Sequence, residues 1–387
     1  MLDIVKKILI IHNNYRNIGG EDIAVKNEIS FLKKYYEVET LYFSNKSNNL
    51  IRNLSTLVFR NNVKSNSKVK FAINNFKPDL IYIHNTWFQA SLGIFDVIKN
   101  TNIKTIVKLH NFRYFCTRYY FSSNHLNNNE ICKACGLINS SVGKINKYFS
   151  DSLIKSLAVI NYGKKYFKIL ENYKIDILVL TDFHKKFLID LGVNEKKITT
   201  YPNNLQLDSK FSENDKINRD YIVYAGRISE EKGVEELIET FIKTDLKDLK
   251  LKIIGKGPNL DSLKETYQNI KIEFIGEKTN KEVLNIISNS RAVVTATKLY
   301  EGQPTLLCEA SSLGVPSIFP DTGGIKEFFP EKYQLAFEQF NYEDLKNKLL
   351  LLNNKEEIKL IGKQNYQYIN EHLNNNKLRK IFKGIHE

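Results

Sequence analysis

The fold of this chain can be inferred from the stretch Tyr300-Glu301-Gly302-Gln303-Pro304-Thr305-Leu306-Leu307-Cys308-Glu309-Ala310. The apolar residues 292–296 indicate a buried strand that leads into it. Pro304 suits the first position of a helix, so we expect a helix from Pro304 onward, with Glu301 in the preceding loop. Glu301 is then expected at the C-terminal mouth of the strand. Glu309 is expected about one and a half turns into the helix, facing the same cleft.

The start of this expected helix is a candidate anion site. Unpaired backbone N–H groups at Gln303 and Thr305, on either side of Pro304, together with the helix macrodipole, favour a bound anion and phosphate above all. The alternative, on this stretch alone, is two solvated acids on either side of an ordinary helix cap. The rest of the chain has to decide between these two interpretations.

Three further motifs surround this stretch in the second half of the chain. Upstream, one strand ends in Gly226-Arg227-Ile228-Ser229-Glu230-Glu231-Lys232-Gly233, and another in Ile253-Ile254-Gly255-Lys256-Gly257-Pro258. Downstream lies Gly314-Val315-Pro316-Ser317-Ile318-Phe319-Pro320-Asp321-Thr322-Gly323-Gly324. Together with residues 300–310, this series resembles the C-terminal domain of the retaining family 4 glycosyltransferases of the GT-B fold, of the type that builds polysaccharides and capsules. The resemblance covers most of residues 220–330.

Length and strand–helix alternation predict an α/β protein with two domains. The 387 residues suffice for two ordinary cores. The resemblance implies two facing Rossmann-like, doubly wound parallel-sheet domains with an interdomain cleft. We expect an N-terminal acceptor-binding domain at 1–205, a linker at 206–219, a C-terminal nucleotide-sugar-binding domain at 220–365, and a C-terminal helix at 366–387 that crosses back to the first domain.

The excess positive charge belongs to the N-terminal half. Of the net charge of +14, residues 1–200 hold 30 Lys and Arg against 15 Asp and Glu, whereas residues 201–387 hold 27 against 28. A basic surface attracts anionic lipid or nucleic acid. Three interpretations remain open: an anionic membrane surface as partner, a merely solvated basic face, or nucleic acid, for which no recognition motif is present.

The first strand, expected at residues 7–12, is followed by Gly19-Gly20-Glu21-Asp22 and a helical pattern. Glycines at such a turn let the backbone approach a ligand closely. This run resembles the acceptor-side loop of a polysaccharide-building subgroup, which implies a substrate-binding role for Gly19, Gly20 and Glu21. His84 and His110 each end an expected strand; His110 resembles the family histidine that reaches the donor sugar.

Three cysteines stand close together in sequence, at Cys116, Cys132 and Cys135. With His125 or His110 as a fourth ligand they could hold zinc. They could equally be reduced thiols, and the sequence does not decide whether they bind a metal.

The chemistry that the resemblance implies needs no metal or other cofactor. The charge on a departing diphosphate must be met by something cationic, and the chain contains no Asp-x-Asp motif for a metal. Arg227 and Lys232 match the family's basic pair that grips the diphosphate, although a surface ion pair with Glu230 or Glu231 is the structural alternative. Glu309 would bind the ribose hydroxyls, and Glu301 the transferred sugar, helped by backbone N–H groups near Gly302 and Gln303.

The hypothesis from sequence is therefore a retaining, metal-independent glycosyltransferase. It would move a hexose or N-acetylhexosamine from a nucleotide diphosphate sugar, UDP-linked in the first instance, to a lipid-linked surface polysaccharide or oligosaccharide. No membrane span or signal peptide is evident, so we expect a cytoplasmic protein, peripheral on the inner face of the cell membrane. A GT-B nucleotide-sugar epimerase and a basic nucleic-acid-binding protein are the alternatives. The donor base, the sugar, the acceptor, the linkage and the oligomeric state are not specified by the sequence.

Overall fold

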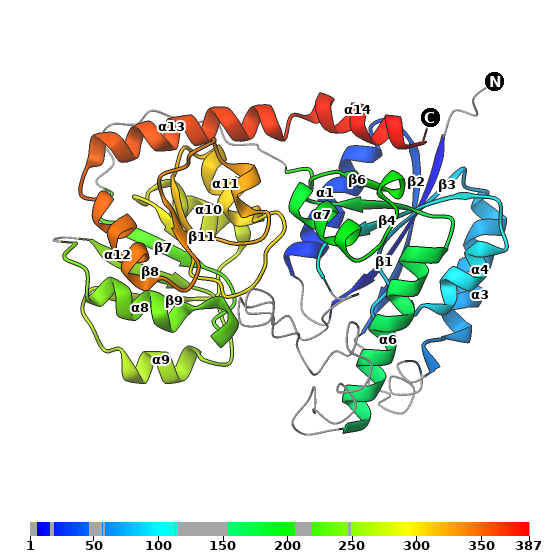
Figure 1. Ribbon diagram of the computed structural model, residues 1–387, viewed down its shortest axis with the longest axis horizontal. Coiled ribbons are helices and arrows are strands. Elements are labelled where there is room, and N and C mark those ends of the chain that lie inside the picture. The colour runs from blue at the N-terminus through cyan, green and yellow to red at the C-terminus, as the bar shows by residue number, and fades with distance from the viewer. Residues whose placement is uncertain are drawn as a thin grey trace. The chain divides into compact units, whose positions relative to one another are not determined.

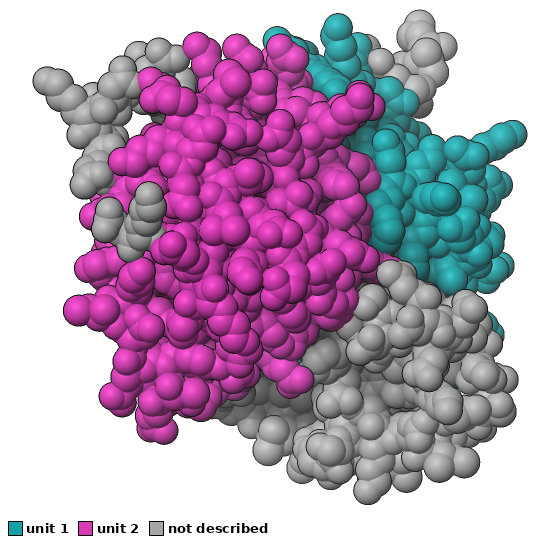
Figure 2. Space-filling view, turned by 60° about the vertical axis from the view of Figure 1, so that its left-hand side comes forward, with its two compact units in different colours: residues 1–119, 124–204, 375–387 teal, residues 120–123, 205–374 magenta. Residues whose placement is uncertain are grey.

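The chain forms two compact units, each with its own six-stranded sheet (Figures 1 and 2). Unit 1 comprises residues 1–119, 124–204 and 375–387, and unit 2 comprises residues 120–123 and 205–374. The computed structural model describes residues 6–15, 19–45, 56, 59–112, 114, 153–205, 219–246 and 249–386. Cys116, Cys132 and Cys135, and nearly all of the expected linker, lie outside the described residues.

The sheet of unit 1 has the strand order β2-β1-β3-β4-β5-β6, and all its paired strands are parallel. Its strands are β1 (Lys7–Asn14), β2 (Glu37–Ser44), β3 (Leu80–Asn85), β4 (Lys104–Leu109), β5 (Asp176–Val179) and β6 (Ile198–Thr200). Its helices are α1 (Gly20–Leu32), α3 (Val63–Phe76), α4 (Gly93–Lys99), α6 (Leu153–Asn172), α7 (Asp182–Asp190) and α14 (Asn375–His386), with a 3-10 turn, η1 (Glu195–Lys197). The connection order reverses between β1 and β3, which makes this the switch point where ligands bind in such sheets.

The sheet of unit 2 has the order β12-β11-β10-β7-β8-β9 and is also parallel. Its strands are β7 (Tyr221–Ala225), β8 (Lys250–Ile254), β9 (Ile272–Gly276), β10 (Val293–Val294), β11 (Ser317–Asp321) and β12 (Ala336–Glu338). Its helices are α8 (Val234–Ile242), α9 (Leu260–Thr266), α10 (Asn280–Ser288), α11 (Thr305–Ser312), α12 (Tyr342–Leu351) and α13 (Lys355–His372), with 3-10 turns η2 (Glu230–Lys232) and η3 (Ile325–Phe328). Here the switch point lies between β7 and β10.

Strands buried on both faces explain why the central runs are almost continuously apolar. In β7, Ile222 and Tyr224 pack into a core with α8 and α12, whereas Val223 points to the opposite core, with α10, α11 and α13. Helices therefore cover both faces of this sheet, as Figure 1 shows. The α/β prediction of two doubly wound parallel sheets is confirmed.

Three details differ from the expected elements. The helix expected from Pro304 begins at Thr305, because Pro304 has φ −81° and ψ 80° and so stands outside the helix as its N-cap. The strand expected over residues 292–296 pairs only at Val293–Val294. The C-terminal helix expected over residues 366–387 is interrupted at Leu373: its first residues belong to α13, which begins at Lys355, and α14 is a separate helix. None of the described helices has the length and apolar character needed to cross a membrane.

Unit 1 contains a fully buried ion pair. Lys108 of β4 donates to Glu28 of α1 at 2.7 Å, and both side chains are completely buried. Tyr82 of β3 also donates to Glu28 at 2.7 Å, and Lys108 lies over the ring of Tyr201 at 4.4 Å. Phe382 of α14 packs against the rings of Tyr82 and Tyr201 and closes the cluster. The cluster therefore joins α1, the central strands and α14 of unit 1.

We expect Lys108→Met to lower the free energy of unfolding by about 3–5 kcal/mol, because it leaves the carboxylate of Glu28 buried without its partner. The double variant Lys108→Met/Glu28→Gln should recover most of this loss. Lys104→Met is the control, since its pair with Asp176 is at the surface and should contribute less than about 1 kcal/mol. Denaturant unfolding measures all three. Equal losses for Lys108→Met and Lys104→Met would contradict the assignment.

Candidate functional site

In unit 2, two of the predicted site residues meet at the switch point. Lys232 lies in η2, after β7, and Glu301 lies in the loop after β10. Lys232 Nζ is 2.5 Å from Oε1 of Glu301, which also accepts from the hydroxyl of Thr297 at 3.1 Å. Both side chains of the pair are about 30% exposed. Lys232 thus pairs with Glu301 rather than with Glu230 or Glu231, the partners considered from the sequence.

The backbone around Glu301 is held by two glycines in the left-handed region. Gly323 has φ +59°, and a Cβ there would lie 2.2 Å from the carbonyl oxygen of Glu301. The next residue, Gly324, donates its N–H to that same oxygen at 2.9 Å. On the other side, Gly233 has φ +64°, and a Cβ there would lie 2.0 Å from the carbonyl oxygen of Ala296. These close approaches bring the loops after β7, β10 and β11 together.

The other predicted donor-site residues lie on neighbouring elements of unit 2. Arg227 follows β7, and its side chain is exposed. Glu309 lies in α11 and receives a long hydrogen bond of 3.5 Å from Asn280 of α10. Burial raises the pKa of Glu309 above its ordinary value. No direct contact joins Arg227 or Glu309 to the Lys232–Glu301 pair in the described contacts, so these residues share one end of the sheet rather than one network.

The start of α11 leaves its first N–H groups without partners inside the helix, as at any helix N-terminus. Gly302 and Pro304 precede it, and Thr305 is its first residue. The side chain of Gln303 is buried and hydrogen-bonds to the thiol of Cys308. The side chain of Gln303, which precedes α11, is thus engaged by a residue of that helix.

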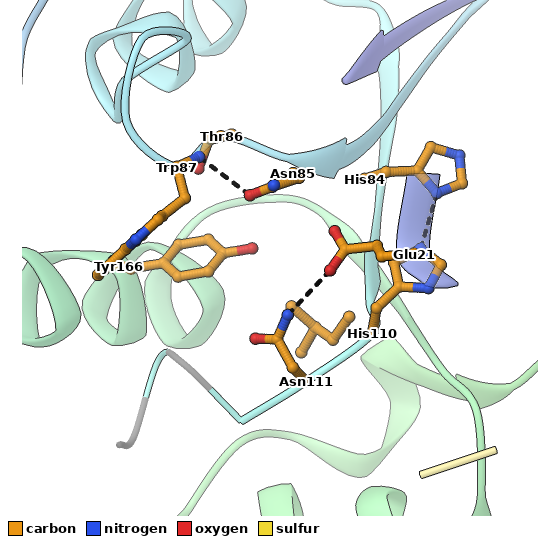
Figure 3. Close-up of a pocket in the computed structure, with 9 residues that line it drawn as sticks. Glu21, His84, Asn85, Thr86, Trp87, His110, Asn111 and Tyr166 are labelled. Carbon is orange, nitrogen blue, oxygen red and sulfur yellow. Dashed lines mark hydrogen bonds between the residues drawn. The ribbon is translucent and has the colours of Figure 1, made fainter. Parts of the chain in front are cut away.

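In unit 1, a pocket opens at the carboxyl ends of the strands beside the switch point (Figure 3). Its enclosed volume is about 20 Å³, the rest of the space being open to solvent, so the pocket as it stands admits a water-sized group. The lining residues come from α1, β3 and β4 with their following loops, and α6: Glu21, His84, Asn85, Thr86, Trp87, Leu109, His110, Asn111 and Tyr166.

Two histidines stack at the inner end of this pocket (Figure 3). His84 Nδ1 and His110 Nε2 are 2.9 Å apart, so one ring donates and the other accepts. Burial, with His110 and Lys108 nearby, lowers the pKa of His84 well below its ordinary value. Burial, with Lys108 and His12 nearby, does the same to the pKa of His110. Both rings are therefore neutral at pH 7. Nε2 of His84 and Nδ1 of His110 are buried and accept or donate no hydrogen bond in the described structure.

Glu21 is fixed by neighbours that the sequence did not single out. Its Oε2 accepts from the hydroxyl of Tyr15 at 2.6 Å and from the side-chain amide of Asn111 at 3.1 Å. Asn111 follows His110 directly, and the repeated His-Asn at two strand ends was the available signal. No sequence signal pointed to the contact of Glu21 with Tyr15, because this contact depends on the conformation of the loop before α1.

Gly19 and Gly20 begin α1, Gly19 as its N-cap. The N–H of Gly19 donates to Oδ2 of Asp22 at 2.8 Å. Burial would raise the pKa of Asp22, but hydrogen bonds from His12 and Gly19 outweigh it and leave that pKa lowered. A Cβ on Gly20 would meet no protein atom within 4 Å, so packing within the chain does not require glycine there.

Within the described part of the chain, no group of three or more His, Cys, Asp or Glu side chains is placed to hold a metal ion. Cys308, a described cysteine, is buried and unpaired by any disulfide. Its thiol pKa is raised well above the ordinary value by burial and by the nearby Glu309.

Comparison with known proteins identifies the C-terminal part of the chain. Residues 206–368 match the family model described as glycosyl transferases group 1. A relative from Bacillus subtilis (strain 168), named as a teichuronic acid biosynthesis glycosyltransferase, TuaC, is 31% identical over 116 residues. That match covers 30% of this chain and spans only 28% of the relative's length.

Solved structures resemble the whole chain. Sucrose-phosphate synthase from Thermosynechococcus elongatus has a TM-score of 0.72 and 15% identity, over 98% of this chain and 99% of that one. HepE from Anabaena, solved with UDP and glucose, has a TM-score of 0.67 and 13% identity over the same shares. At these identities the likeness concerns the fold. The chain therefore has the GT-B fold of two Rossmann-like units, and its residues 206–368 match the family model of the glycosyl transferases group 1.

Proposed function

We propose that this protein is a retaining, metal-independent glycosyltransferase that uses a nucleotide diphosphate sugar, with UDP as the expected base. The observation that carries the proposal is the meeting of Lys232 and Glu301 at the switch point of a group 1 domain. A cation and a carboxylate placed there, beside the start of α11, match a ligand that presents both a diphosphate and sugar hydroxyls. Arg227 supplies a second cation on the loop after β7.

The likeness to solved structures supports the choice of donor. HepE was solved with UDP and with UDP-glucose, and TarM from S. aureus, with a TM-score of 0.60, was solved with UDP. For this chain we assign Arg227 and Lys232 to the diphosphate and Glu309 to the ribose hydroxyls. Glu301 would hold the transferred sugar, a hexose or N-acetylhexosamine, with the backbone N–H groups of Gly302, Gln303 and Thr305 beside Pro304 completing the site.

In unit 1 we assign Gly19, Gly20 and Glu21 to the acceptor and His110 to the reacting sugar. The support is the small pocket at the ends of the strands, on which the polar side chains of Glu21, His110 and Asn111 converge. The open space above Gly20 adds to this, because the fold does not require glycine at that position. Neutral His110 can donate or accept a hydrogen bond at a sugar hydroxyl without adding charge.

The acceptor that we propose is a lipid-linked surface polysaccharide or oligosaccharide. The relatives support this class, since TuaC is named for teichuronic acid biosynthesis and a further likeness, with a TM-score of 0.59, is to the lipopolysaccharide outer core galactosyltransferase WaaB. With the positive charge of residues 1–200, such an acceptor fits a protein that works at the inner face of the cell membrane.

Donor binding should be measurable without metal. In the presence of EDTA, one nucleotide diphosphate sugar of a panel with UDP, GDP and ADP should raise the melting temperature, since a ligand that binds only the folded state stabilises it. Lys232→Met should weaken this shift, because a cation for the diphosphate is lost. Lys256→Met, which removes a surface pair with Glu277, should not. A shift that requires added metal would overturn the metal-independent assignment.

Glu301→Gln should lower turnover, because it removes about 2–4 kcal/mol of transition-state stabilisation. It should leave the fold intact. Its pair with Lys232 is partly exposed, so its loss should change the free energy of unfolding by less than about 1 kcal/mol. Glycosyl transfer assays and denaturant unfolding of the same samples separate the two effects. Glu265→Gln on exposed α9 is the control. Turnover at the wild-type level would exclude Glu301 from the reaction.

The assigned role of His110 requires a neutral ring, which makes stability depend on pH in a defined direction. Below about pH 6.5 the unfolded chain binds protons on His84 and His110 that the folded chain does not. The free energy of unfolding should therefore fall as pH is lowered, by up to about 1.4 kcal/mol per pH unit for each histidine. His84→Asn should reduce the slope. A flat profile between pH 7.5 and 5.5 would contradict the buried neutral pair.

A further inference from the structure

Helix α3 of unit 1 exposes large apolar side chains among lysines. Phe71 is 68% exposed and Val63 is 72% exposed, and Phe59, shortly before the helix, is 71% exposed. Lys64, Lys68 and Lys70 on the same helix are exposed as well. We call these six residues the α3 surface. Single exposed apolar residues are ordinary, but three of them close together in sequence among lysines need a reason.

The opposite side of α3 packs against the rest of unit 1, so the backbone that carries the exposed side chains is held in place. Ser65, Val69, Ala72 and Ile73 are buried. Ser65 and Asn62 donate to the carbonyl oxygen of Gln89, at 2.5 and 2.8 Å. Figure 1 shows α3 beside α4 at the edge of unit 1. The exposure of Val63 and Phe71 is thus a property of a packed helix.

Helical geometry gives the α3 surface an order. Val63 and Phe71 lie about 80° apart around the axis, so both face outward, with the exposed Ser67 and Asn74 between them. Lys64 and Lys68 flank this outward face on one side and Lys70 on the other. Exposed apolar side chains bordered by lysines allow a helix to lie in the interface of a bilayer, with apolar groups among the acyl chains and ammonium groups at the phosphates.

We propose that the α3 surface is the place where this protein docks on a lipid bilayer with anionic headgroups. The inference deepens the membrane association in the proposed function and rests on it for its biological meaning, but binding itself requires no glycosyl transfer. Phe59, Val63 and Phe71 insert at the level of the headgroups, and the three lysines meet lipid phosphates.

The same residues argue against other occupants. Helix α3 contains no Asp or Glu, so two copies facing each other through it would bring lysines against lysines. A nucleic acid backbone would pair with the lysines but would leave Val63 and Phe71 in water. A bilayer satisfies the charges and the apolar groups together.

Vesicle sedimentation of the full chain tests the proposal, using phosphatidylcholine with and without phosphatidylglycerol. The protein should bind only the anionic vesicles, and less as salt rises. Val63→Ser/Phe71→Ser should weaken binding about tenfold, and so should Lys64→Gln/Lys68→Gln/Lys70→Gln. Size-exclusion chromatography should show the same oligomeric state for wild type and both variants.

Matched controls separate a local surface from diffuse attraction. Lys33→Gln/Lys34→Gln/Lys380→Gln removes the same charge from exposed positions elsewhere in unit 1, and Ile270→Ser removes an apolar side chain that is 91% exposed in unit 2. Both should bind vesicles within about twofold of wild type. Equal losses of vesicle binding for the two triple-lysine variants would overturn the proposal. Full vesicle binding by Val63→Ser/Phe71→Ser would also overturn it, and so would a change of oligomeric state as the main effect of the α3-surface variants. Donor-induced thermal shifts on the same samples report the proposed function independently.

Discussion

Parallel pairing is the constraint on which the rest of the structure depends. Every strand pair of the two described sheets is parallel, and the central strands are buried on both faces. Such strands carry few polar side chains along their length, Lys108 of β4 being an exception that is paired with Glu28, so most polar groups collect where the strands end. His84 is the penultimate residue of β3 and His110 follows β4, and Lys232 and Glu301 follow β7 and β10. Both candidate sites lie at strand ends because the strands themselves are buried on both faces by apolar packing.

The two units differ in how exposed their central ion pairs are. In unit 2, Lys232 and Glu301 form a partly exposed pair whose members can exchange partners with a ligand at little cost. In unit 1, Lys108 and Glu28 are sealed inside the core, where partner exchange would be costly. Lys108 nevertheless acts on the pocket, because it adds to the effect of burial in lowering the pKa of both His84 and His110. Lys108 therefore favours the neutral form of both rings without lining the pocket.

Local patterns in the sequence were sufficient for the fold class and for most strand cores, whereas contacts between distant residues were not. Strand–helix alternation predicted an α/β protein, and the family resemblance implied two doubly wound parallel sheets; this fold class is confirmed. The start of α11 was misplaced by one residue, because proline restricts φ but leaves ψ to the surrounding loop. The contact of His84 with His110 depends on the register of β3 with β4, and the contact of Tyr15 with Glu21 on loop geometry. The assigned roles of the site residues and the domain boundaries stay predictions.

The placement of α14 has a consequence for how the protein is made. Phe382 and Leu378 complete the core of unit 1, yet ribosomes synthesise them after all of unit 2. During translation, Tyr82 and Tyr201 are therefore without the side chains of α14 that pack against them until residues 205–374 of unit 2 have been synthesised. The N-terminal unit, though made first, is finished last, so the growing polypeptide has an extended period in which chaperones can engage it.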